Sequence, residues 1–214
     1  MTESFPFHLR DADAATSEAP YTFFVPLREE RIQVSVGDLV KLGFEYEWET
    51  QDYGGERMWV KVTGKSGLDF TGTLANEPWE PGLQLGLEVA FGIGNILDIE
   101  WDAPELHPPF HKHAAYWERC LVDDCVLNGI VPAEYVYREE PDMTDKEDKY
   151  PDSGWRIRGQ DGHPGADPID NRSVSYVALG AVLNKDDSFL DLLKAPVGSA
   201  FMRDFAKGQY FPAE

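Results

Sequence analysis

Apolar and polar residues alternate through most of the segment from Val34 to Trp101. A two-residue period is typical of strands that bury one face, and it recurs in VSVGDLVKLGFEYEW, RMWVKVTG and LDFTGTLAN. The glycines of GKSG predict a tight turn between the second and third strands, and LEVAFGIGNILDIEW predicts two further strands joined at its glycines. Because a closed barrel leaves no sheet edge exposed, we predict a small SH3-like antiparallel β-barrel over residues 21–101.

Prolines interrupt this pattern directly after the barrel segment. The stretch DAPELHPPFHKH contains three prolines within twelve residues, so it can form neither a helix nor a central strand. We predict a linker there, at residues 102–116. Residues 1–20 show no sustained period of either kind, and we predict that they form a mobile arm.

The C-terminal half mixes strand and helix signals. RCLVDDCVL, AEYVYREE, SGWRIRG and GSAFMRDF predict strands, whereas KDDSFLDLLKAP predicts a capped helix that ends at Pro196. The run VSYVALGAVLN fits either a buried strand or part of a helix. We therefore predict an α+β domain with an antiparallel sheet at residues 117–214, which makes the whole chain α+β.

Acidic residues far outnumber basic ones, 39 to 19, for a formal net charge of -20. Such a charge repels phosphate backbones and anionic bilayers, so we predict no nucleic-acid or membrane partner. It could instead steer a basic protein or help to hold cations, and an ordinary acidic soluble protein would have the same composition. No run approaches the roughly 20 apolar residues of a membrane-spanning helix, and the N-terminal residues do not predict a secretory signal peptide. Two cysteines are too few for a disulfide scaffold. We expect a cytoplasmic protein of undetermined oligomeric state.

Three separated blocks of the C-terminal half carry a resemblance to a known family. They are YREEP at residues 137–141, DSGWR at 152–156 and APVGSAF at 195–201. In this order they resemble the immunity-protein-thirty-three-like family over residues 117–214. The resemblance implies an intracellular bacterial protein that is encoded near a polymorphic toxin and that binds and neutralises it.

The N-terminal half resembles a second family. GERMWVKVTGKSGLDFTGTLANEP and GLQLGLEVAFGIGNILDI are similar to a bacterial domain of unknown function, number twenty-three fourteen, over about residues 54–100. That family brings no established catalytic residues, so the resemblance implies domain structure and no activity.

An acidic run joins the first two resemblance blocks. It contains two lysines and seven acids, which are Glu139, Glu140, Asp142, Asp145, Glu147, Asp148 and Asp152. Such a segment cannot bury itself, and three interpretations stay open: a solvated loop, a toxin-facing surface, or a calcium site that lacks the EF-hand order. If the run faces a partner, the adjacent Trp155, Arg156 and Arg158 are of the residue types that dominate interface energetics. A Trp in such a position is more often an anchor of the core or its rim than a contact for a ligand.

Three histidines, His107, His111 and His113, crowd the proline-rich linker. Imidazoles bind zinc or nickel, so a metal-binding protein or an enzyme that uses these histidines is an alternative function. No residue lies in a nucleophile motif, and no glycine-rich phosphate loop is present, so neither catalysis nor a cofactor is predicted. Our main prediction is a non-catalytic module that binds a basic toxin, and an uncharacterised housekeeping or regulatory module is a third possibility.

Overall fold

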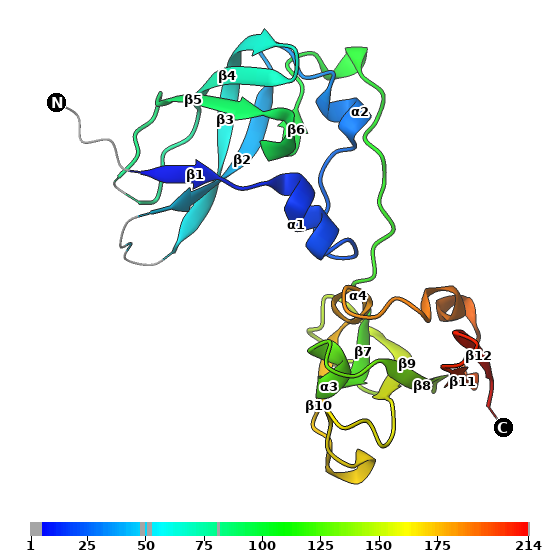
Figure 1. Cartoon of the computed structure of the whole chain (residues 1–214). Helices are drawn as coiled ribbons and strands as arrows, with labels where there is room; N and C mark the ends of the chain where they lie inside the picture. The colour runs from blue at the N-terminus through cyan, green and yellow to red at the C-terminus, as the bar shows by residue number, and fades with distance from the viewer. Residues whose placement is uncertain (1–5, 48–49, 51–52, 81, 214) are drawn as a thin grey trace. The chain divides into compact units, whose positions relative to one another are not determined.

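The chain divides into two compact units in the computed structural model, which describes residues 6–47, 50, 53–80 and 82–213 (Figure 1). Unit 1 contains the residues up to Glu18 together with Phe23–His113. Unit 2 contains Ala19–Thr22 and Ala114–Glu214. Each unit is built around its own hydrophobic core. None of the helices in the described residues has the length and apolar character needed to cross a bilayer.

Unit 1 is built on a nearly closed antiparallel barrel, sheet A. Its strands are β1 (Phe7–Leu9), β2 (Leu39–Tyr46), β3 (Gly55–Ser66), β4 (Asp69–Leu74), β5 (Glu88–Gly92) and β6 (Ile96–Glu100). β2 pairs with β3 along one edge and with both β6 and β1 along the other, so the sheet curls around a single core. A 3₁₀ turn, η1 (Ile93–Asn95), joins β5 to β6 where the glycines predicted a turn. The predicted antiparallel barrel is confirmed.

The alternating pattern of the sequence explains which face of each strand is inside. On β2, Val40, Leu42 and Phe44 are fully buried in the core, whereas Lys41 and Glu45 beside them are only partly buried. β3 continues this arrangement with Met58 and Val60, which are also buried. Apolar side chains every second residue therefore fill the barrel from all sides.

The segment predicted as a mobile arm contains two regular elements. β1 pairs with β2, and the ring of Phe7 lies 5.1 Å from that of Phe44 in the core. A helix follows, α1 (Ala12–Glu18), and Asp13 on it forms an ion pair at 2.6 Å with the buried Arg31 of α2 (Arg28–Arg31). Strand pairing and this ion pair hold residues 6–18 within unit 1, and their strand is too short to show a period in the sequence.

Unit 2 is built on a second six-stranded sheet, sheet B. Its strands are β7 (Arg119–Asp123), β8 (Ala133–Arg138), β9 (Asp152–Gly159), β10 (Val174–Ala178), β11 (Ala200–Asp204) and β12 (Gln209–Pro212), in the order β10-β7-β9-β8-β11-β12. All neighbours are antiparallel except β7 and β9. β9 lies between β7 and β8, and it runs antiparallel to β8 and parallel to β7. The sheet is thus mostly, not entirely, antiparallel.

The helices of unit 2 are short. The ambiguous run forms both predicted structures in turn, strand β10 and then helix α4 (Leu179–Leu183). The end of the first predicted strand is instead helix α3 (Asp124–Leu127). The predicted α-helix before Pro196 is a 3₁₀ helix, η4 (Leu190–Lys194). Asp186, which precedes it, accepts a hydrogen bond from the backbone N–H of Ala133 on β8. Unit 2 has a further 3₁₀ turn, η3 (Ile169–Asn171), and another, η2 (Pro104–Leu106), belongs to unit 1.

The short segment Ala19–Thr22 belongs to unit 2 because side chains hold it there. Asn184 accepts a hydrogen bond from the Tyr21 backbone N–H at 2.9 Å and donates one to the Thr22 hydroxyl at 2.7 Å. The Tyr21 hydroxyl donates to Asp187, and this hydrogen bond, with burial, raises the pKa of Tyr21 to about 12. Tyr21 therefore remains a neutral donor at physiological pH.

Gly72 offers a test of the barrel packing. A Cβ atom there would lie 2.5 Å from Val60 Cγ1 and 2.6 Å from the carbonyl oxygen of Lys61, so Gly72→Ala forces strands β3 and β4 apart. We expect the free energy of unfolding of unit 1 to fall by about 1–3 kcal/mol, the usual cost of overpacking. Urea denaturation measures it, with the exposed Thr63→Ala on β3 as the control. Equal stability of the two variants would contradict this packing.

Candidate functional site

The acidic run forms a single loop between β8 and β9, residues 139–152, which we call the acidic loop. Six of its seven acidic side chains are exposed, namely Glu139, Glu140, Asp142, Asp145, Glu147 and Asp148. The seventh, Asp152, is buried at the start of β9. The loop thus presents a dense negative surface while its last acid turns inward.

Arg156 fixes the base of the acidic loop. Its two Nη groups donate to the two carboxylate oxygens of Asp152, each at 2.9 Å. Nε donates to Glu139 at 2.5 Å, Nη2 donates to Asp142 at 3.2 Å, and Nη1 reaches the carbonyl oxygen of Trp155 at 3.2 Å. All five N–H groups of the guanidinium have a partner, so this buried cation is fully satisfied. One arginine therefore binds both ends of the loop.

Asp152 and Gly154 complete this anchor. Burial alone would raise the pKa of Asp152, but hydrogen bonds from Arg156 and from the backbone N–H groups of Gly154 and Met143 outweigh it and lower the pKa. Gly154 has a φ of +79°, and a Cβ atom there would overlap the carbonyl oxygen of Glu139. Glycine is needed at this point because the two ends of the loop approach so closely.

The three residues predicted as anchors of a protein contact have different positions. Trp155 is 1% exposed and packs in the core of unit 2, and Arg156 is 2% exposed beneath the acidic loop. A partner cannot touch either side chain in this structure, which corrects their assignment to a contact surface. Arg158 remains accessible: its side chain is 27% exposed and forms an ion pair at 2.9 Å with buried Asp123.

The three histidines of the linker pack against aromatic rings. The ring of His107 stacks on Trp101 at 3.8 Å, and that of His113 stacks on Phe24 at 5.0 Å while its Nε2 lies 3.1 Å from a backbone carbonyl oxygen. His111 meets His113 edge to face. Among the described residues, no three His, Cys, Asp or Glu side chains are placed to hold a metal ion. The described geometry gives the metal-binding alternative no support.

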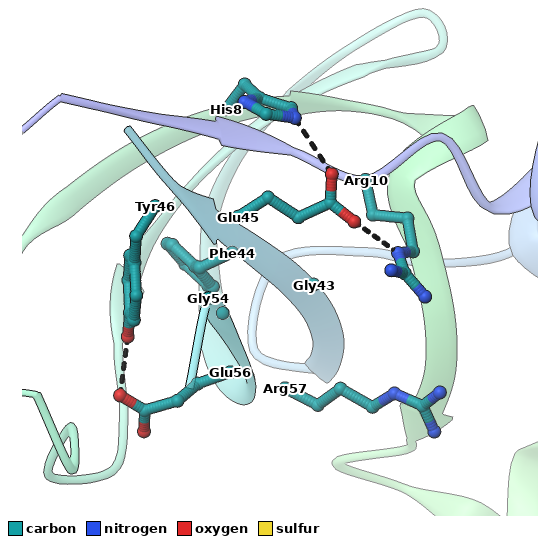
Figure 2. Close-up of a pocket in the computed structure, with 10 residues that line it drawn as sticks. His8, Arg10, Gly43, Phe44, Glu45, Tyr46, Gly54, Glu56 and Arg57 are labelled. Atoms are coloured by element: carbon teal, nitrogen blue, oxygen red, sulfur yellow. Dashed lines mark hydrogen bonds and ion pairs between the residues drawn. The ribbon is translucent and has the colours of Figure 1, made fainter. Parts of the chain in front are cut away.

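A cavity of about 490 Å³ lies on sheet A, along β1, β2 and β3 (Figure 2). Glu45 accepts a hydrogen bond from Arg10 at 2.6 Å and lies 2.8 Å from His8, and the bond from Arg10 lowers the pKa of Glu45. Tyr46 donates to Glu56 at 2.5 Å, and two backbone N–H groups also donate to Glu56. Each carboxylate in this cavity is already held by partners of unit 1, an arrangement that stabilises the sheet.

Cys120 is the most buried candidate for covalent chemistry. Burial raises the pKa of its thiol to about 12, so the reactive thiolate is absent at neutral pH. The cysteine therefore acts as a core residue of unit 2.

The role of Arg156 as the anchor of the loop is not among the features predicted from the sequence. A signal was present, because an arginine four residues after an aspartate at the end of an acidic run has a carboxylate within reach. That Asp152 would be buried depends on β9 lying between β7 and β8, which no local pattern reveals.

Removal of the Arg156 charge tests the anchor. Arg156→Gln leaves Asp152 buried without its cation, and we expect the free energy of unfolding to fall by about 3 kcal/mol or more. Hydrogen exchange of the loop amides should accelerate as well. Lys146→Gln removes the same charge from an exposed position and is the matched control. If the two variants were equally stable, Arg156 would not be the anchor.

The lowered pKa of Asp152 predicts how stability changes with pH. A carboxylate whose pKa is lower in the folded protein stabilises it above the ordinary value of 3.8, and this contribution disappears as the pH falls through the lowered pKa. Asp152→Asn should therefore be less stable than the wild type at neutral pH, and the difference should shrink below about pH 4. Denaturation curves across this range measure it. A difference that grows with acidity would contradict the assignment.

Comparison with known proteins bears on unit 2. No curated protein and no solved structure matches the chain. A family model does match, described as the Immunity protein Imm33 domain, over residues 120–213. The resemblance of the N-terminal half to a domain of unknown function stays a prediction. Residues 120–213 thus match the Imm33 domain, the family that the three sequence blocks predict.

Proposed function

We propose that this protein is a non-catalytic immunity protein that binds a basic bacterial toxin in the cytoplasm and neutralises it stoichiometrically. The match of residues 120–213 to the Imm33 domain supports a protein partner. The observation that carries the proposal further is the acidic loop, which presents six exposed carboxylates and whose base is held by Arg156 through Glu139, Asp142 and the buried Asp152. A negative surface on an immunity domain is complementary to a positively charged partner.

The anchored base gives the loop an advantage over a disordered acidic tail. Because Arg156 holds both ends of the loop, less conformational entropy is lost when a partner orders it. The net charge of -20 acts in the same direction at longer range, since it attracts a basic protein before contact. These charges should raise the association rate more than they slow dissociation.

Affinity capture from a lysate of the source cell is the first test. The wild-type protein should retain one basic protein at low salt and much less of it at high salt, because salt screens exposed charges. Mass spectrometry identifies the retained protein, which is then purified for kinetic measurements. Retention of no protein, or of an acidic protein whose binding ignores salt, would overturn the proposal.

Neutralising the loop tests its role in association with the purified partner. The triple variant Asp145→Asn, Glu147→Gln, Asp148→Asn should lower the association rate constant by about tenfold at low salt and change dissociation little. A matched control removes three exposed charges from unit 1, at Glu88, Glu100 and Glu105. Equal effects of the two triple variants would mean that total charge, and not the acidic loop, attracts the partner.

A further inference from the structure

One face of sheet B is free of the core of unit 2. On β8, Val136 is fully buried, so the alternation of the strand turns Tyr135 and Tyr137 to the opposite face. The rings of these two tyrosines lie 5.1 Å apart and nearly parallel, which keeps them in one orientation. Helix α4 packs with Val136 in the core and so covers the other side.

The strand register aligns four side chains on this face. Arg158 on β9 is paired with Tyr135 on β8, Tyr135 with Met202 on β11, and Met202 with Phe211 on β12. Paired residues of antiparallel strands share a face, so the four form one row across four adjacent strands. With strands about 4.8 Å apart, the row is roughly 14 Å long. We call Arg158, Tyr135, Met202 and Phe211 the contact row.

The contact row is unusual for a surface in contact only with water. Met202 is 44% exposed and Phe211 is 41% exposed, and the two are neighbours on the edge of the sheet. Arg158 is oriented at the other end by its ion pair with Asp123 and by a hydrogen bond to a backbone carbonyl oxygen. Tyr, Phe, Met and Arg are the residue types enriched in protein interfaces. A row made only of them indicates a contact surface more than a solvated one.

The acidic loop begins directly beside the contact row. Tyr137, the neighbour of Tyr135 on β8, is paired with Arg156, whose Nε holds Glu139 of the loop. Burial and the charge of Glu139 both raise the pKa of Tyr137. An apolar centre bordered by charges has the arrangement of a protein interface, with anchors inside and a polar rim.

We propose that the contact row is the docking surface for the partner: a basic protein inserts apolar side chains against Tyr135, Met202 and Phe211 while its cations face the acidic loop. The negative charge beside the row selects a positively charged occupant over a second copy of this chain, whose net charge is also -20. This inference rests on the proposed function and names the surface that performs it. Affinity then comes from the row, and the association rate comes from the loop.

The test uses the partner protein that the wild type retains from the lysate, purified and titrated against variants. Met202→Ala with Phe211→Ala should weaken binding at least about tenfold, mainly through faster dissociation, because hot-spot anchors control the lifetime of a complex. The matched control is Val174→Ala with Val197→Ala, two apolar residues of unit 2 that are 44% and 40% exposed but lie outside the row. The control should bind within about twofold of the wild type.

Each outcome has a separate meaning. If the row variant binds as tightly as the control while loop neutralisation still slows association, the contact row is not the docking surface and the proposed function stands. If the wild type retains no protein, the proposed function fails and this inference falls with it. If the wild type alone forms a dimer that the row variant abolishes, the occupant is a second copy and our proposal is overturned. Hydrogen exchange of β11 and β12 checks that the row variant keeps its strands paired.

Discussion

The ion pair between Arg156 and Asp152 is the interaction on which the surface of unit 2 depends. Burying a guanidinium or a carboxylate alone costs several kcal/mol, so each makes the burial of the other possible. Their bidentate contact at 2.9 Å leaves Nε and one Nη hydrogen free for Glu139 and Asp142. Repulsion among Glu139, Asp142 and Asp152 at the base of the loop is thereby reduced, while Asp145, Glu147 and Asp148 farther along the loop stay exposed.

Strand order explains why this pair can exist. β9 lies between β7 and β8, so a residue on it is covered by neighbours on both sides. The same insertion makes the acidic loop the connection between two adjacent strands, with its ends forced together at Gly154. It also places Arg158 one strand away from Tyr135. A single topological feature therefore positions both the acidic loop and the contact row.

Much of the fold could be predicted because local patterns control it. The strands of the barrel follow the alternation that ends with Val40, Leu42 and Phe44 in the core. The three sequence blocks of the C-terminal half predicted the family that the comparison then found. The acidic loop was also recognised as a loop, since seven acids cannot be buried together.

The features that could not be predicted from the sequence depend on contacts between residues that are distant in the chain. Arg156 was predicted to contact a partner, yet it is buried, because a short β9 segment cannot reveal that it lies in the middle of a sheet. The segment before Pro196 forms a 3₁₀ helix and not the predicted α-helix. Met202 and Phe211 are far from Tyr135 in the chain, and only strand register brings them into one row.

The loop and the row can act at different stages of one encounter because their forces have different ranges. Charges on the loop attract over about 8–10 Å at physiological ionic strength, whereas apolar contact begins only when surfaces touch. An acidic protein that approached the row would be repelled by the loop before the row could bind it. In the proposed encounter, selection by charge therefore precedes selection by shape. The acidic loop would also limit non-specific association at the exposed apolar row, because it repels acidic proteins.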